Sequence, residues 1–232
     1  MGAGEALLGG FAYFFSVWQL CYLQFSPFVL AFLVGIQLPT GHPHGRPGVA
    51  GATLLPCLGY TIGFCLVYPL LVASGLSLSR PLIAHIDTLR ITSGAVILVI
   101  GAYLLQRGRW PLLAGAQRPA ALAAMSLLLG LGVAFVYSPC ITPMLSAIMG
   151  IGSQRATAAL GWWLALSYGL GSSIAICTVA VALILAMRER EVVARHAAVI
   201  RTVCGVFVLA LALLNLTGLM TWYKAFALGF AL

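Results

Sequence analysis

Charged side chains are scarce in this chain: only 7% of its 232 residues are Asp, Glu, Lys or Arg, and only four of those are acidic. With 62% hydrophobic residues and a mean hydropathy of +1.08, the composition excludes a soluble domain and predicts a multi-pass membrane protein. The net charge of +8 therefore reports membrane topology and not a nucleic-acid partner. No ionisable residue falls in the middle of an apolar segment, which disfavours a proton-coupled transporter.

The chain also lacks the common signatures of metal, cofactor and disulfide-scaffold proteins. Its six cysteines form no close Cys-x-x-Cys or Cys/His pair, so we expect neither a zinc site nor a bound cofactor. His42 and His44 share a glycine-rich loop, but the loop supplies no Cys or carboxylate to complete a copper or nickel site, and a solvated loop is favoured. Glu5 and the absence of Lys or Arg before the first apolar run indicate that the first helix is retained.

Six apolar segments predict an all-α fold with six transmembrane helices in a single domain covering residues 1–232. They are residues 7–38, 51–76, 86–105, 120–152, 157–187 and 197–220. A spanning helix needs about 20 residues, so the first, fourth and fifth segments are too long for one straight helix. After the sixth segment, Trp222, Tyr223 and Lys224 mark an interface, and we expect the tail 221–232 to lie on the membrane surface.

The basic residues predict the orientation of these helices. If the N-terminus is outside, eight basic residues fall on the inner side and four on the outer side. The inner group is Arg46, Arg107, Arg109, Arg118, Arg188, Arg190, Arg195 and Arg201; the outer group is Arg80, Arg90, Arg155 and Lys224. The positive-inside rule therefore favours both termini outside.

A proline-flanked cysteine interrupts the fourth segment in the run Ser138-Pro139-Cys140-Ile141-Thr142-Pro143. Pro139 and Pro143 each remove a backbone donor, so a helix here must break or kink. Such a break is tolerated at membrane depth only where protein or a watery cavity covers it. Cys140 would start the second half-helix, whose free N–H groups and positive dipole end favour a thiolate. Cys140 is the candidate redox thiol.

The first segment contains a similar motif, Ser26-Pro27-Phe28, which lies 112 residues before Ser138 and places Phe28 where Cys140 stands. Two further pairs of segments are similar, 58–63 with 166–171 and 90–94 with 201–205, at offsets of 108 and 111. Repeat one then covers about 7–105 and repeat two about 120–220, with three spans each. An odd number of spans inverts the second repeat, and broken helices of the two repeats then meet near the midplane.

The 3+3 plan, the run 138–143 and the segment Tyr168-Gly169-Leu170-Gly171 resemble the CcdA family, which includes the membrane domain of DsbD. The resemblance covers the chain to about residue 219. It implies a bacterial inner-membrane protein of cytochrome c biogenesis and thiol–disulfide exchange. Electrons would pass from cytoplasmic thioredoxin through a cysteine pair to an extracytoplasmic thioredoxin-like protein.

The chain departs from this family where Phe28 replaces the first cysteine and Ala31 replaces its proline. A relay needs a second thiol; Cys21 is seven residues before Phe28, about 10 Å along a helix, too far to pair with Cys140 without a backbone shift. We therefore expect no internal disulfide and a first half locked by Phe28 packed towards Cys140. Three functions stay open: an oxidoreductase working through Cys140, a redox-inactive subunit or assembly factor of a larger membrane complex, and a small-solute or metal-ion transporter.

Overall fold

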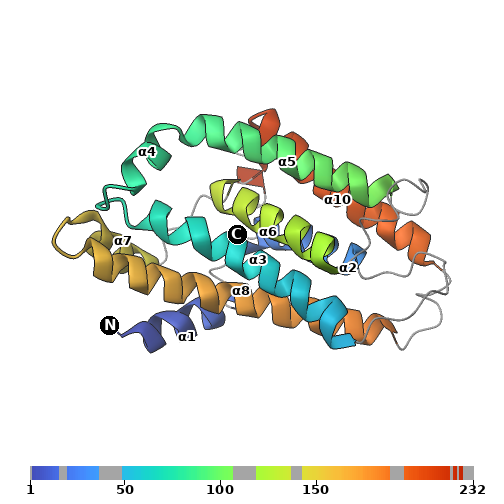
Figure 1. Cartoon of the computed structure of the whole chain (residues 1–232), viewed down its shortest axis with the longest axis horizontal. Coiled ribbons are helices and arrows are strands. Elements are labelled where there is room, and N and C mark those ends of the chain that lie inside the picture. Colours follow the sequence, from blue (N-terminus) through green and yellow to red (C-terminus); the bar gives the residue numbers. More distant parts are fainter. Residues whose placement is uncertain are drawn as a thin grey trace.

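The computed structural model describes residues 2–15, 20–36, 49–106, 119–136, 143–188, 196–219, 222–223 and 225–226. Over these residues the chain is helical and contains no strand (Figure 1). The helices are α1 Ala3–Phe14, α2 Leu20–Gly35, α3 Val49–Val72, α4 Ser79–Ala84, α5 Ile86–Gln106, α6 Pro119–Val136, α7 Pro143–Ser153, α8 Ala158–Arg188 and α10 Ala197–Leu216. The expected all-α class is confirmed over these residues.

Four of these helices are long and apolar enough to cross a membrane. They are Thr53–Val72 in α3, Ile86–Gln106, Ala158–Met187 in α8 and Ala197–Leu216. They match the second, third, fifth and sixth apolar segments of the sequence, so the chain has the character of a multi-pass membrane protein. The sequence did not predict α4, which is held to the end of α3 by a hydrogen bond of 2.8 Å from the Ser79 hydroxyl to the Ala73 carbonyl.

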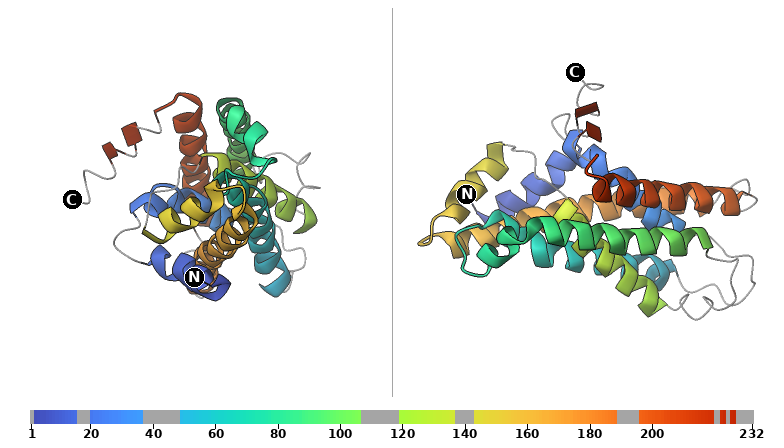
Figure 2. Two further views of the ribbon diagram at one scale, coloured as in Figure 1. Left: turned by 90° about the vertical axis from the view of Figure 1, so that its left-hand side faces the viewer. Right: turned by 90° about the horizontal axis from the view of Figure 1, so that it is seen from above.

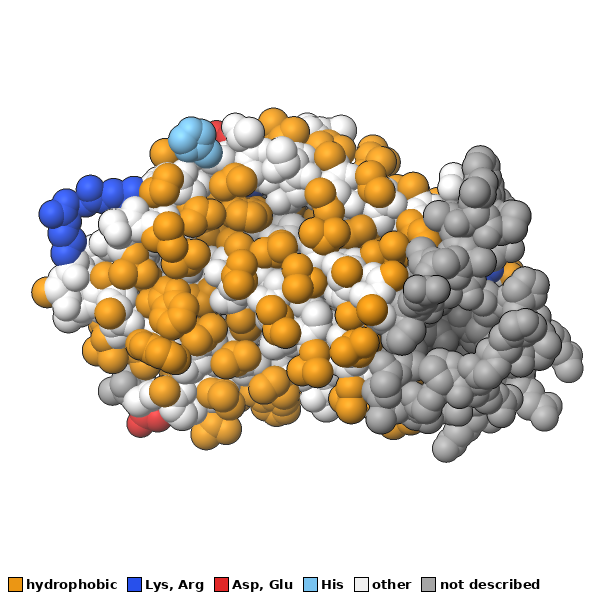
Figure 3. Space-filling view, viewed as in Figure 1, with side chains coloured by type: hydrophobic (Ala, Val, Ile, Leu, Met, Phe, Trp, Pro, Cys, Tyr) orange, Lys and Arg blue, Asp and Glu red, His pale blue; other side chains and the backbone are white. Residues whose placement is uncertain are grey.

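The surface of the bundle is apolar, as a lipid-facing surface requires. On α3, Leu58, Ile62 and Leu66 are all more than half exposed and share one face at helical spacing. The opposite face buries a column of rings, with Tyr60 against Phe64 at 6.1 Å and Phe64 against Tyr68 at 4.9 Å between centroids. Hydrophobic side chains spread in the same way over the whole face in view in Figure 3, apart from its left end and the grey region.

Helices from the two halves of the sequence are interleaved in the bundle. Helix α3 packs on α6 and α8, α1 packs on α8, and α5 packs on α10. The long helices run roughly along one direction, as the side and end views show (Figures 1 and 2). Each half therefore buries its apolar faces against the other half.

The structure corrects one expectation about the first segment. The sequence placed a helix break at Ser26-Pro27, but α2 runs through Pro27 without ending. The division falls earlier, between the end of α1 at Phe14 and the start of α2 at Leu20. Proline removes one backbone hydrogen bond from a helix. Here Phe28, Val29 and, one turn later, Phe32 and Leu33 are buried in the core, and this packing holds the helix together around the proline.

Candidate functional site

The cysteine motif of the fourth segment is flanked by two helices. Helix α6 covers residues up to Val136 and α7 begins at Pro143, and the helix break that the prolines predict lies between them, outside the described residues. Ser138, Pro139 and Cys140 lie outside the described residues. The predicted thiolate at Cys140 therefore stays a prediction from the sequence.

The residues of the first Ser-Pro motif are core residues of α2. Ser26 is 4% exposed and Phe28 is 5% exposed. The Phe28 ring lies 6.0 Å from the ring of Phe207 on α10 and 6.0 Å from the ring of Tyr223. The expected packing of Phe28 on Cys140 involves a residue outside the described part of the chain. The contacts that the structure describes place Phe28 against α10 and the segment that follows it.

Two helix crossings in the bundle are built in the same way. Where α3 crosses α6, an added Cβ at Gly63 would meet the Leu127 carbonyl, and one at Gly130 would meet the Tyr60 carbonyl. Where α1 crosses α8, an added Cβ at Gly171 would meet the Leu7 carbonyl, and one at Gly10 would meet the Tyr168 carbonyl. Each crossing thus brings two backbones together through glycines of both helices, as small residues allow in membrane helices. At the α3–α6 crossing an added Cβ at Gly59 would also meet the Ala123 carbonyl.

The residues of these four glycine contacts correspond in pairs. Gly63 and Gly171 are 108 residues apart, as are Tyr60 and Tyr168, whereas Gly10 and Gly130 are 120 apart, as are Leu7 and Leu127. In both crossings a glycine of the longer helix contacts the shorter helix of the other half: Gly63 of α3 contacts α6, and Gly171 of α8 contacts α1. An exchange of the two halves therefore turns one crossing into the other.

The contact between α5 and α10 has the same reciprocal form. An added Cβ at Gly94 would lie 3.0 Å from the Leu216 side chain, and one at Gly205 would lie 2.7 Å from the Leu105 side chain. Gly94 and Gly205 are 111 residues apart, as are Leu105 and Leu216. If the two halves are exchanged, α5 takes the place of α10 and the Gly94–Leu216 contact becomes the Gly205–Leu105 contact.

These contacts match the residues of the first and fourth segments at a different offset from the one that the Ser-Pro motifs give. The Ser-Pro motifs match at an offset of 112, but the crossings match at 120, a difference of two helical turns. In the crossing register Phe28 corresponds to Ile148, which is fully buried, so Phe28 stands where the other half also has a core residue. Cys21 follows Gly10 by eleven residues, and Cys140 follows Gly130 by ten.

A second group of thiols, which the sequence did not single out, lies where α3 meets α8. Cys57, Cys65 and Cys177 are all unbridged. The Cys177 Sγ lies 3.7 Å from the Cys57 carbonyl oxygen, to which it donates, and 3.8 Å from the Thr61 hydroxyl. Cys57, Thr61 and Cys65 are spaced four residues apart, as are Ser173 and Cys177. Residues at this spacing share one face of a helix, so the pattern could have indicated this group from the sequence.

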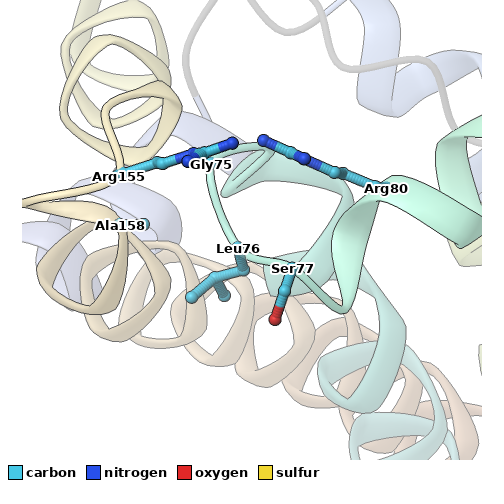
Figure 4. A pocket seen from close by; sticks show the side chains of 6 residues that line it. All are labelled: Gly75, Leu76, Ser77, Arg80, Arg155 and Ala158. Carbon is cyan, nitrogen blue, oxygen red and sulfur yellow. The ribbon is translucent and has the colours of Figure 1, made fainter.

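A positively charged hollow lies at the end of the bundle where α3 ends and α8 begins. It has a volume of about 440 Å³ and is lined by Gly75, Leu76, Ser77, Arg80, Arg155 and Ala158. Arg80 and Arg155 extend towards one another from opposite sides of it (Figure 4). Two guanidinium groups at one mouth attract anions, with a strength that falls as salt is added. The sequence places both arginines on the outer side of the membrane.

The remaining candidates from the sequence are the histidines and a metal site. His42 and His44 are outside the described residues. Within the described residues, no group of three or more His, Cys, Asp or Glu side chains is placed to hold a metal ion. Comparison of the chain with family models, curated proteins and solved structures finds no match.

Proposed function

We propose that the chain is a CcdA-like thiol–disulfide transporter of the bacterial inner membrane, with Cys21 and Cys140 as its exchanging pair. It would carry reducing equivalents from cytoplasmic thioredoxin to an extracytoplasmic thioredoxin-like protein in cytochrome c biogenesis. The single observation that carries the proposal is the repeated glycine crossing, because its register brings the two cysteines to within one residue of correspondence.

The reciprocal crossings support two inverted three-helix repeats. In this arrangement α1 with α2 forms the first span and α6 with α7 forms the fourth, each made of two short helices. The four long helices supply the remaining spans. With six spans, both termini lie outside, in agreement with the distribution of basic residues. Divided helices of two inverted repeats meet near the midplane in transporters of this architecture.

The crossing register supports Cys21 as the second thiol that the Ser-Pro alignment failed to find. Measured from the glycine at each crossing, Cys21 and Cys140 differ by only one residue in position. Each follows the end of the first short helix of its span, α1 or α6. Phe28 is then a packing residue of α2, and its replacement of a cysteine in the Ser-Pro alignment no longer argues against a relay.

The proposed reaction is a pair of thiol–disulfide exchanges. A thiolate of the reduced donor attacks the Cys21–Cys140 disulfide, and a second donor thiol resolves the mixed disulfide, which leaves the donor oxidised and the chain with two thiols. A thiolate of the chain then attacks the disulfide of the acceptor, and the other thiol resolves that intermediate. One disulfide is consumed and one is formed in each half-reaction, so two electrons and two protons move per cycle.

Complementation of a strain that lacks its thiol-reductant transporter tests this function. The unmodified chain should restore holocytochrome c, and Cys21→Ser and Cys140→Ser should each abolish the restoration. Cys204→Ser and Phe28→Leu are matched controls that should leave it intact, because Cys204 lies in α10 and leucine keeps the apolar contact of α2. In membranes from cells without the cytoplasmic donor, differential alkylation should find Cys21 and Cys140 joined.

The other outcomes of this experiment select among the alternatives. If Cys140→Ser abolishes maturation while Cys21→Ser does not, the chain works with one thiol of its own and the register argument fails. If the unmodified chain restores nothing and its thiols stay reduced, the redox-inactive subunit is the better assignment. A transporter of small solutes or metal ions would leave holocytochrome c unchanged in every variant.

A further inference from the structure

The interface between α3 and α8 carries a line of small polar side chains at membrane depth. Cys57, Thr61 and Cys65 follow one another at four-residue spacing on α3, and Ser173 and Cys177 do so on α8. The two helices contact one another along this line, with Cys177 beside Cys57 and Ser173 beside Cys65. Apolar side chains would pack this interface without any hydrogen-bonding requirement, so the choice of thiols and hydroxyls needs a chemical reason.

The closest pair in this line joins the two halves of the chain. The sulfur of Cys177 lies 3.7 Å from the Cys57 carbonyl oxygen and 3.8 Å from the Thr61 hydroxyl. The Cys177 thiol therefore contacts the backbone of Cys57 itself. Cys57 is 6% exposed and Cys177 is half-buried. Rotation about the two Cα–Cβ bonds is the movement that brings such neighbouring thiols towards a covalent S–S distance.

Two buried hydroxyl groups lie on the same two helices as the pair. The Tyr60 hydroxyl is fully buried and has no hydrogen-bond partner among the described residues, and the same holds for the Ser173 hydroxyl apart from its sulfur neighbour Cys65. These donors are available to a sulfur that carries transient negative charge. They lower the cost of forming a thiolate, which is otherwise high in an apolar interior.

We propose that Cys57 and Cys177 form a second dithiol, independent of Cys21 and Cys140, that is reversibly oxidised to a disulfide between α3 and α8. A disulfide is neutral and apolar, which suits the interior of a membrane bundle. A two-coordinate soft metal ion such as Cu(I) would need both thiols ionised and would leave a net negative charge there. Within the described residues, no group of three potential ligands is placed to hold a metal.

The co-reactant is a lipid-soluble two-electron oxidant of the quinone class. The Cys177 thiolate adds to the oxidant, and the Cys57 thiol then displaces the reduced product and forms the S–S bond. Two thiols lose two electrons and two protons, and the quinone takes up both to become the quinol. The reagent diamide reacts in the same sense, with its N=N bond reduced to a hydrazine.

The oxidised pair would tie the two halves together near one end of the bundle. Cys57 lies eight residues from the start of α3 at Val49, and α8 ends at Arg188, eleven residues after Cys177. Both helix ends lie at the same end of the bundle (Figure 1). A covalent link there prevents α3 and α8 from separating, and such separation is one way for inverted repeats to open a central site.

A cleavable chain measures this disulfide directly. A protease site placed between α5 and α6 separates Cys57 from Cys177 once it is cut, so the two fragments stay together on a non-reducing gel only if a disulfide joins them. The full chain is treated with diamide in native membranes, in a Cys21→Ser/Cys140→Ser background, and is cut afterwards. We expect most of the chains to remain linked, and the link to be lost on addition of a reductant.

Single substitutions identify the link and set the result that would overturn it. Cys57→Ser and Cys177→Ser should each abolish it, while Cys204→Ser, at another buried cysteine, should not; linked peptides from the parent chain should contain Cys57 and Cys177. If both thiols of the folded parent chain are still alkylated after diamide, or if linkage survives Cys57→Ser, the proposal is wrong. Because Cys21 and Cys140 are absent, a failure here leaves the proposed relay untouched, and the complementation assay judges that relay separately.

Discussion

Replacement of Gly63 by alanine tests the close helix crossing on which the repeat register depends. The new Cβ would meet the Leu127 carbonyl, which belongs to the backbone of α6 and cannot rotate away. A carbon and a carbonyl oxygen need about 3.3 Å between them, so α3 and α6 must move apart by about 1 Å. A gap of that size forfeits a quarter to a half of the dispersion energy of each contact along the crossing.

The expected free-energy change is the difference between two opposing effects. Overpacking against a rigid neighbour costs about 3 kcal/mol, the upper end of the usual range. Alanine regains about 1 kcal/mol of helix propensity relative to glycine. The net loss of about 2 kcal/mol corresponds to a fall in Tm of about 4–8 °C for a chain of this length. Gly171→Ala, at the equivalent position on Leu7, should lower Tm by a similar amount.

Thermal unfolding of the purified chain in detergent, followed by tryptophan fluorescence, measures these shifts. Gly150→Ala is the matched control, because an added Cβ there has no atom within 4 Å and only the propensity gain applies, so Tm should rise or stay constant. If Gly63→Ala behaves like Gly150→Ala, the close approach of the backbones is refuted. If Gly63→Ala and Gly171→Ala differ widely, the two crossings are not equivalent and the register loses its support.

Three further predictions address the topology, the contact between α5 and α10, and α4. Reporter fusions after Arg109 and after Lys224 should lie in opposite compartments, and reports from the same side would contradict the six-span arrangement. Asn215→Ala removes a hydrogen bond of 2.7 Å from its side-chain amide to the Arg90 carbonyl; such bonds between membrane helices contribute about 0.6 kcal/mol on average, so Tm should fall slightly. Thr217→Val, which loses only a bond to Leu213 within α10, is its control. Ser79→Ala removes the buried hydrogen bond to Ala73 that ties α4 to α3 and should speed cleavage between α3 and α4 by a protease of broad specificity, whereas Ser153→Ala, which loses an exposed local bond, should not.

The sequence and the glycine contacts give two different correspondences between the first and the fourth segment. Ser26-Pro27 does resemble Ser138-Pro139, and proline does disfavour a helix interior. The resemblance gave an offset of 112, but the crossings give 120, because contacts across the bundle and not local motifs decide which residues of the two halves correspond. A glycine that meets a carbonyl on another helix leaves no mark in its own local sequence. Cys57 and Cys177 are 120 residues apart, and no local sequence pattern predicts that they lie close together, because their contact depends on how α3 and α8 pack.

By itself, the sequence determined the class of the molecule and the bounds of its four long apolar helices to within a few residues. These features depend on composition and on the length of apolar runs, both of which act locally. Only the tertiary structure decided that α2 continues through Pro27, that Phe28 faces Phe207 and Tyr223, and that Cys177 rests on Cys57. Those outcomes depend on which faces of distant helices come together, and that is set by the shape of the whole packed bundle, because in lipid close packing and not hydrophobicity selects the partner of each helix.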